Sequence, residues 1–346
     1  MNIEIGKKVK TLRLQKRMTQ EELAEKLNIS SQAVSKWENN VTMPDIQVLP
    51  DLSVILGVTI DELFALTDDT HLKRIENMIY SERFIAKDDF SYAEQFLKDK
   101  LNDKSKKSEC LTLLSKLHNH RADEHHEVAA DYARDALVLA PDNKDNHCAL
   151  REAENGVNCD WNGFNHHKLI DYYKNFVKNN PNYWQGYLWL MDSLISDGRC
   201  SEARISLENM NKIHPGYLYQ LYGGMIYKEE CNLPKALELW DQMIKLYPYE
   251  WAAWFSRGDC MVRICRYDEA VKYYLKGYEL QAKPKYWDSL EAIYHIYEIQ
   301  EKYDKAIQKM DEIIVLLKSD WKITEGETVD FYKREIERLK KMAGMN

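Results

Sequence analysis

Apolar residues recur at helical spacing along the first 66 residues, in short runs that end at polar stops. Ile5, Val9 and Leu12 mark a first helix of this kind. Thr19 begins a second, because its hydroxyl can cap the helix while Glu22, three residues later, completes a capping box. The pattern therefore predicts short amphipathic helices rather than strands.

Three further helices complete this segment. Ser30 caps a third helix that runs through Asn39, and Pro44 opens a fourth that ends near Gly57. Thr59 then opens a fifth. The segment is predicted to be a five-helix domain that ends at residue 66.

The pattern changes after this domain. A polar stretch over residues 67–72 predicts a linker, and residues 73–346 then repeat a pair of helices. Each clear pair carries a small residue followed four positions later by a large one: Ala203 with Leu207, Ala236 with Trp240, Ala270 with Tyr274, and Ala306 with Met310. The intervals between these alanines are 33, 34 and 36 residues. Prolines mark the ends of most pairs, at Pro141, Pro181, Pro215, Pro248 and Pro284.

This period and pattern resemble the tetratricopeptide repeat, in which a small residue stands where the two helices approach closely. The resemblance implies about seven units, over residues 74–107, 110–141, 150–181, 184–215, 217–248, 251–284 and 287–320. The third unit is degenerate, because Leu169 replaces the small residue and Gly156 interrupts the first helix. Residues 327–343 are expected to form the polar capping helix that such arrays need.

The segment TQEELAEKLNISSQAVSKWEN, residues 19–39, resembles the helix-turn-helix of the XRE (phage-repressor-like) family. Ala24 is the small residue at the helix crossing, and Val34 and Trp37 are the apolar anchors of the second helix. Asn28 takes the place of the usual glycine in the turn, a conformation that asparagine adopts at low cost. The predicted fold is therefore all-α: a five-helix helix-turn-helix domain followed by a tetratricopeptide-like helical-repeat superhelix.

Helix geometry selects the residues that would read DNA. With Val34 and Trp37 buried, the opposite stripe of the helix faces outward. It consists of Ser31, Gln32, Ser35, Lys36 and Asn39. A recognition helix presents its N-terminal part to base edges, so the first four are the base-reading candidates. Gln32 can bond adenine and Lys36 can donate to guanine.

Four further roles follow from the family resemblance. Gln20 and Asn39 would hold phosphates, and Arg13 with Glu38 would brace the first helix against the reading helix. Arg13 would in addition point toward a phosphate. Two other interpretations remain open: an ordinary solvated helix face, and a head that contacts only proteins.

Charge is distributed unevenly along the chain. The net charge is −8, yet residues 1–66 contribute only −1. An acidic tail excludes a protein that coats nucleic acid along its whole length. Six of the eight basic residues of the head fall in one helix-length stretch, which favours a local basic surface: Lys7, Lys8, Lys10, Arg13, Lys16 and Arg17.

The repeat array is expected to bind a peptide or a protein. Projecting the inward positions of the repeat family onto the clear units nominates effector-binding residues. They are Trp189, Asp192, Tyr222, Met225, Phe255, Asp259, Arg263 and His295, with Lys228 and Glu229 among further projected positions. The alternative is that the aromatic members only pack one repeat against the next.

The whole arrangement resembles bacterial regulators that respond to small signalling peptides. It implies a sequence-specific DNA-binding transcriptional regulator whose array binds an effector, mediates dimerisation, or both. A homodimer on palindromic double-stranded DNA is the expected assembly. The competing hypothesis is an interaction protein, such as an antitoxin or a defence-system component, whose head regulates only its own promoter.

Other classes find little support in the sequence. It contains no membrane span, no secretory signal and no C-x-x-C pair among its seven cysteines, so a cytoplasmic protein with reduced thiols is expected. The common hydrolase, nucleotide-binding and metalloprotease motifs are missing, so we expect no enzyme and no cofactor. A histidine-rich stretch containing His118, His120, His125 and His126 could hold a metal ion, but no spacing there fixes a tetrahedral set, so a hydrophilic patch is the expectation.

Overall fold

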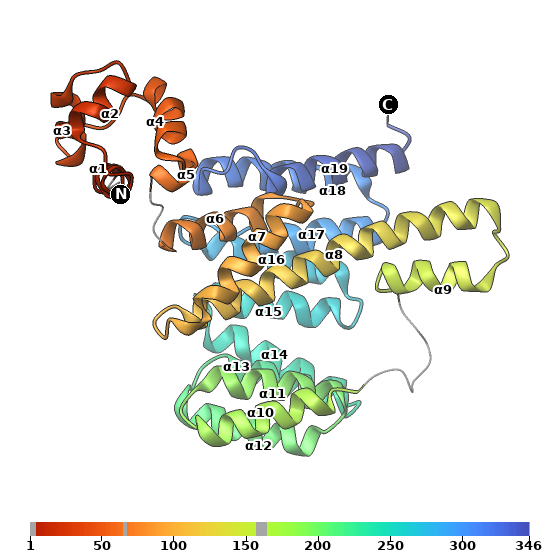
Figure 1. Ribbon diagram of the computed structural model, residues 1–346. Helices are drawn as coiled ribbons and strands as arrows, with labels where there is room; N and C mark the ends of the chain where they lie inside the picture. Colours follow the sequence, from red (N-terminus) through yellow and green to blue (C-terminus); the bar gives the residue numbers. More distant parts are fainter. Residues whose placement is uncertain (1–4, 65–67, 157–164, 346) are drawn as a thin grey trace. The chain divides into compact units, whose positions relative to one another are not determined.

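A computed structural model describes residues 5–64, 68–156 and 165–345, and these residues form helices without any strand (Figure 1). The all-α prediction is confirmed. The helices pack into two compact units, Met1–Glu154 and Asn155–Asn346. No helix of the described part is long and apolar enough to cross a membrane.

The first unit opens with the five expected short helices. They are α1 (Ile5–Gln15), α2 (Gln20–Lys26), α3 (Ser31–Glu38), α4 (Leu49–Leu56) and α5 (Ile60–Leu63), with a 3-10 turn over Ile46–Val48 before α4. Thr19 and Glu22 form the capping box at the start of α2, and Ser30 caps α3. Asn28 has a φ of 53°, so the turn does require a residue that tolerates the left-handed region.

These five helices enclose one small core. It consists of Ile5, Val9, Leu23, Ala24, Val34, Trp37, Leu49, Leu52, Leu56 and Leu63. Gly6 permits the closest approach within it: a Cβ on Gly6 would lie 1.8 Å from the carbonyl oxygen of Trp37. Only glycine fits there, because that oxygen belongs to the backbone of α3 and cannot move aside as a side chain does.

The helices α6 (Asp68–Ser81) and α7 (Lys87–Asp99) follow the head. The linker expected over residues 67–72 is therefore wrong for residues 68–72, which form the first turn of α6. Asp68 and Asp69 lie in that turn, where acidic side chains stabilise the N-terminal end of a helix. A polar run that looks like a linker is thus also a good helix start.

The largest departure from the expected repeats is α8 (Lys107–Leu139), a single helix of 33 residues. The sequence had suggested a two-helix unit over residues 110–141. No glycine or proline occurs within α8, so nothing in it breaks the helix, and the expected hairpin does not form. A short helix, α9 (Lys144–Ala153), then packs back along α8.

A buried carboxylate joins α8 to the loop between α6 and α7. Glu124 accepts a hydrogen bond from the Ile85 amide at 2.6 Å and pairs with Arg121 at 2.7 Å. Arg121 also donates to the Ile85 carbonyl at 2.8 Å. Polar groups with such complete hydrogen bonding are tolerated inside a protein, and they fix the loop against the long helix.

The second unit is a series of helix hairpins. Its helices are α10 (His167–Asn179), α11 (Trp184–Ser196), α12 (Cys200–Ile213), α13 (Leu218–Glu229), α14 (Leu233–Leu246), α15 (Trp251–Val262), α16 (Tyr267–Leu280), α17 (Asp288–Ile299), α18 (Tyr303–Leu316) and α19 (Glu327–Met342). The pairs α11–α12, α13–α14, α15–α16 and α17–α18 coincide with the four clear units of the sequence, and α19 is the expected terminal helix. The boundary between the two compact units lies at Glu154, inside the region expected to be one array and within its degenerate third unit.

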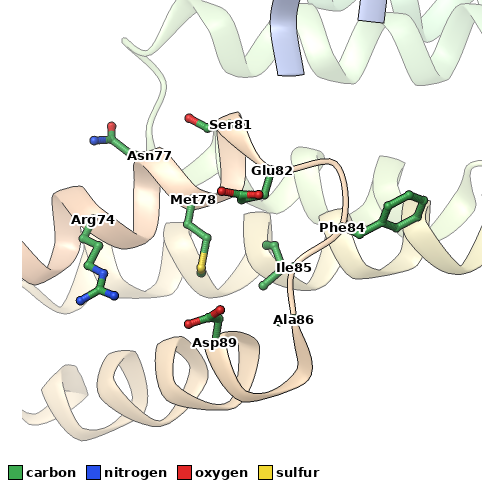
Figure 2. A pocket seen from close by; sticks show the side chains of 9 residues that line it. All are labelled: Arg74, Asn77, Met78, Ser81, Glu82, Phe84, Ile85, Ala86 and Asp89. Atoms are coloured by element: carbon green, nitrogen blue, oxygen red, sulfur yellow. The ribbon is translucent and has the colours of Figure 1, made fainter. Parts of the chain in front are cut away.

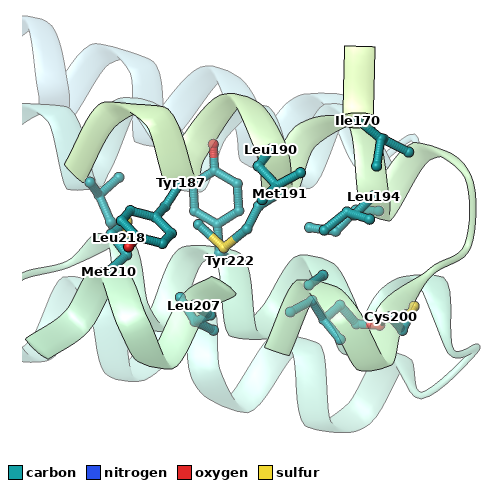
Figure 3. Packing of buried hydrophobic residues seen from close by; sticks show 13 residues of the cluster. Ile170, Tyr187, Leu190, Met191, Leu194, Cys200, Leu207, Met210, Leu218 and Tyr222 are labelled. Atoms are coloured by element: carbon teal, nitrogen blue, oxygen red, sulfur yellow. Dashed lines mark hydrogen bonds between the residues drawn. The ribbon is translucent and has the colours of Figure 1, made fainter. Parts of the chain in front are cut away.

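Small residues meet large rings inside these hairpins. Ala236 and Trp240 are fully buried, and the indole nitrogen of Trp240 donates to the Leu221 carbonyl at 3.1 Å. Gly224 on α13 faces the same indole, as Gly258 on α15 faces the ring of Tyr274. Figure 3 shows the corresponding core of α10 to α13, where aliphatic and aromatic side chains of successive helices converge.

We predict that Gly224→Ala destabilises the repeat array, because the added methyl would lie 2.2 Å from Nε1 of the buried Trp240. Overpacking of this kind costs about 1–3 kcal/mol of unfolding free energy. Gly216→Ala is the matched control, since a Cβ there meets nothing within 4 Å. Thermal unfolding of the full chain tests this, and equal midpoints for the two variants would contradict the packing described.

Candidate nucleic-acid interface and a cavity in the repeat array

The helix α3 presents one buried and one open face. Val34 and Trp37 point into the head core. Of the five residues expected to face outward, Gln32, Lys36 and Asn39 are exposed, and Ser31 and Ser35 are half-buried. The side chains that can reach a ligand from this helix are therefore an amide, an ammonium and a second amide, all from one stripe.

A buried polar network holds α3 against α1 and α2. Arg13 donates from Nε to Oε1 of Glu38 at 2.6 Å and from Nη2 to Oε2 at 2.8 Å. Its Nη1 donates to the Met18 carbonyl at 2.7 Å, and Gln20 donates to Oε2 of Glu38 at 2.8 Å. The structure thus brings together the two residues of the expected brace, in a bidentate geometry that fixes orientation as well as distance.

The electrostatics of the network favour its ionised form. Burial alone would raise the pKa of Glu38, but the hydrogen bonds from Arg13 and Gln20 outweigh it and lower that pKa. The hydrogen bond to Glu38 raises the pKa of Arg13 in turn. Both side chains are almost completely shielded from solvent, so each charge is compensated by the other and not by water.

Phosphate contacts were expected for Arg13, Gln20 and Asn39, and the structure shows that each of these side chains already makes a hydrogen bond within the head. Arg13 is 6% exposed and its guanidinium is occupied, so it lies inside the head instead of facing a phosphate. Gln20 uses its amide within the network, which the sequence could not reveal because an amide can donate to either kind of acceptor. Asn39 is exposed, and its amide donates to the Ser35 carbonyl at 2.8 Å. Phosphate contacts by Gln20 and Asn39 stay predictions.

The basic stretch over residues 7–17 keeps most of its side chains at the surface. The Lys16 ammonium lies beside Gly57, at the C-terminal end of α4. A cation at that place stabilises the helix end, whose carbonyl groups carry partial negative charge. Lys7, Lys10, Lys16 and Arg17 are exposed and Lys8 is half-buried, so the basic surface expected from the sequence loses only the buried Arg13.

A cavity of about 410 Å³ lies in the second unit, between the C-terminal ends of α11 and α13 and the residue that follows α15. It is lined by Asp192, Ile195, Ser196, Met225, Lys228, Glu229 and Arg263. Five of these were projected from the sequence. Ile195 and Ser196 were missed, although they follow Asp192 by one helical turn and so share its face.

Tyrosine hydroxyls hold the carboxylates near this cavity. Tyr222 donates to Oδ1 of Asp192 at 2.8 Å, and Tyr274 donates to Oδ1 of Asp259 at 2.5 Å. Solvent reaches Asp192 from the open side, yet the protein atoms around it desolvate the carboxylate and raise its pKa. Burial raises the pKa of Asp259 as well.

The other nominated effector residues do not line the cavity. The ring of Trp189 is tilted against that of Tyr173 at 5.5 Å between centroids, and the ring of Phe255 lies 5.1 Å from that of Tyr274. These contacts agree with the alternative that the aromatic residues pack one repeat against the next and do not bind a ligand. His295 is exposed on α17 beside the ring of Tyr294, outside the cavity.

The histidine-rich stretch has ordinary structural partners. His118 lies 3.2 Å from the Glu94 carboxylate, and His120 bonds the Glu82 carbonyl at 2.7 Å. Within the ranges that the structure describes, no three His, Cys, Asp or Glu side chains are placed to hold a metal ion.

Burial raises the pKa of the Cys260 thiol to about 12, so this thiol stays protonated at neutral pH.

A further cavity of about 430 Å³ occurs in the first unit, between α6, the following loop and α7 (Figure 2). Its lining residues are Arg74, Asn77, Met78, Ser81, Glu82, Phe84, Ile85, Ala86 and Asp89. Phe84 is half-exposed and packs under the guanidinium of Arg83 at 5.0 Å. The loop that closes this cavity is the one fixed by Glu124.

Comparison with known proteins identifies the head. Residues 9–63 match the family model described as helix-turn-helix. Over 87 residues the chain is 40% identical to the HTH-type transcriptional activator BcrR of Enterococcus faecalis. The match covers 22% of this chain and 43% of that protein, so the chain spans less than half of its relative.

Two solved structures show how the helical array compares. A tetratricopeptide repeat protein from Parabacteroides merdae superposes with a TM-score of 0.39 and 12% identity, over 79% of this chain and 98% of that one. PlcR of Bacillus thuringiensis, solved in complex with the peptide PapR7 and DNA, gives a TM-score of 0.25 and 14% identity over 86% and 98% of the two chains.

We predict that Glu38→Ala destabilises the head, because it leaves the Arg13 guanidinium buried without its carboxylate. Removing one partner of a buried ion pair costs about 3–5 kcal/mol. Hydrogen exchange of the α3 amides in the full chain measures the loss locally. Glu25→Ala, which removes an exposed carboxylate from α2, should leave the exchange rates unchanged.

The pH dependence of α3 follows from the lowered pKa of Glu38. Its contribution to stability is fully present above the pKa that Glu38 has in the unfolded chain. It is lost as pH falls through the lower pKa of the folded state. Acid should therefore weaken hydrogen-exchange protection of α3 in the wild type and change it much less in Glu38→Ala. An equal acid response in both proteins would argue against this assignment.

Proposed function

We propose, from the premise that residues 9–63 form a helix-turn-helix domain, that this chain is a sequence-specific DNA-binding transcriptional regulator. The observation that carries the proposal is the open stripe of α3. Gln32 and Lys36 are exposed on a helix that a buried ion-pair network holds in place. Side chains fixed in this way can match base edges without a large loss of conformational freedom.

Each residue of the stripe has a separate role in the proposed complex. Gln32 offers a donor and an acceptor that fit adenine, and Lys36 donates to the acceptors on the major-groove edge of guanine. Ser31 and Ser35 lie on the same face and make shorter contacts. Gln20 and Asn39 stand at the ends of α2 and α3, where they would contact phosphates and set the position of α3 in the groove.

Arg13 and Glu38 act in this proposal only through α3. Both side chains are almost completely buried, so they do not contact DNA themselves in this proposal. Their network joins α1, α2 and α3, and it sets the angle at which the open stripe meets the groove. They are positioning residues for base reading.

The assembly that fits this function is a cytoplasmic homodimer on a palindromic operator. One helix-turn-helix reads only a short half-site, so two heads related by a two-fold axis are needed for useful specificity. The repeat array is proposed to bind a peptide or protein effector and to couple that binding to the spacing of the heads. Nothing in this role requires catalysis, and we propose a binding protein, not an enzyme.

We predict that the pair Gln32→Ala and Lys36→Ala weakens binding to the DNA upstream of the chain's own gene. Each lost bidentate contact costs about 1–3 kcal/mol, which is roughly a 5- to 150-fold loss of affinity. A gel-shift titration with competitor DNA measures it. The matched control is Gln95→Ala with Lys98→Ala, an exposed pair of the same composition on α7.

The salt dependence of the same titration separates the contacts. Base-reading side chains set the preference for one sequence, whereas lysine contacts to phosphates set the slope of affinity against salt. The double variant should lose its preference over competitor DNA. If wild type and double variant bind equally, with the control pair also unchanged, α3 does not read the bases.

A further inference from the structure

The cavity between α11, α13 and the end of α15 is lined by as many acidic as basic side chains. Two carboxylates, Asp192 and Glu229, face two cations, Lys228 and Arg263. We infer that this cavity binds the main chain of an extended peptide, with Asp192 accepting a peptide N–H and Arg263 donating to a peptide carbonyl. The inference rests on the proposed function, in which the array binds an effector, and it names the part of the effector that is recognised.

Asp192 is prepared to accept a hydrogen bond from a ligand. Its Oδ1 takes the Tyr222 hydroxyl at 2.8 Å, which fixes the carboxylate between α11 and α13. Within the described residues no donor is bonded to its second oxygen, and that oxygen has lone pairs left for a ligand. A carboxylate that is already oriented loses little freedom when a ligand binds.

Arg263 is prepared to donate. It is exposed at the C-terminal end of α15, and its guanidinium makes no ion pair with any residue in the described ranges. Burial raises the pKa of Asp192 and of Asp259, and the charge of Arg263, which lies near both carboxylates without bonding either, opposes part of that rise. The five donors of a guanidinium can thus turn to a ligand without breaking an existing contact.

The balance of charge favours a neutral ligand group. A ligand carboxylate at Arg263 would be repelled by the nearby Asp192 and Asp259, and a ligand ammonium at Asp192 would be repelled by Arg263. The other two charged side chains of the lining form a weak ion pair, in which the Lys228 ammonium lies 3.7 Å from the Glu229 carboxylate, so their charges largely cancel. A peptide unit carries no net charge, yet its N–H can donate to Asp192 while its carbonyl accepts from Arg263.

The remaining lining fits a peptide in size and polarity. Ile195 and Met225 supply an apolar part of the wall, and methionine adapts its shape to different side chains. A volume of about 410 Å³ is within the usual range for small-ligand sites and suits a short stretch of chain. The cavity would therefore hold the main chain firmly while tolerating variation in the side chains.

Binding can be tested with a library of heptapeptides that are acetylated at the N-terminus and amidated at the C-terminus, so that no terminal charge contributes. Peptides selected on the full chain are measured by fluorescence anisotropy. Asp192→Asn and Arg263→Gln should each weaken binding about tenfold, because each replaces a charged hydrogen-bonding group by a neutral amide, and charge-assisted hydrogen bonds are roughly twice as strong as neutral ones. Arg266→Gln is the control, since Arg266 lies three residues further on and bonds Glu269 instead.

Two readouts distinguish main-chain recognition from recognition of charge. Methylating the peptide nitrogens one at a time should abolish binding at one or two positions in every selected sequence. Affinity should change less than about threefold between 50 and 500 mM salt, because neutral groups are little affected by screening.

Thermal unfolding checks that the variant still folds. Asp192→Asn should be no less stable than wild type at neutral pH, because burial already disfavours the charged carboxylate.

Three results would overturn the inference. They are unchanged affinity in both cavity variants, selected peptides that all need a charged side chain and lose binding steeply with salt, and a library that yields no binder. None of these results depends on DNA. Failure of the gel-shift titration would instead remove the proposed regulator function and leave recognition of a peptide main chain standing.

Discussion

Close approach between helices is the constraint on which both units depend. In the head, Gly6 lets α1 approach the backbone of α3, where the Trp37 carbonyl leaves no space for a methyl group. In the array, Gly224 and Gly258 receive the rings of Trp240 and Tyr274 in the same way. Such contacts bring two backbones close together and fix the crossing of the helices, since interiors are densely packed and tolerate little added volume.

This packing determines where the functional groups stand. Because α1 lies close to α3, the short distance allows Arg13 to bond Glu38 with two parallel hydrogen bonds, and the open stripe of α3 is fixed in turn. Because successive hairpins stack closely, the Tyr222 hydroxyl on α13 reaches Asp192 on α11 and orients it. The polar contact between helices is buried in the head and partly buried in the array, and each contact joins helices that carry exposed polar groups.

The local chemistry of the helices could be predicted from the sequence, and contacts between distant residues could not. The capping box at Thr19 and the left-handed turn at Asn28 depend on neighbouring residues, so the pattern revealed them. The expected hairpin over residues 110–141 does not form, because a repeat spacing alone cannot end a helix and α8 contains no glycine or proline that would. The contact of Gln20 with Glu38 joins residues 18 positions apart, and either a carboxylate or a phosphate would satisfy that amide.

The central claim is that α3 enters the major groove and reads base edges there. Methylation interference on the bound operator tests this most directly, because methylation at guanine N7 blocks an acceptor that only a major-groove ligand uses. We expect N7 methylation within each half-site to prevent binding by the wild type, and this effect to disappear at one guanine in Lys36→Ala. Interference confined to adenine N3, in the minor groove, would contradict the claim.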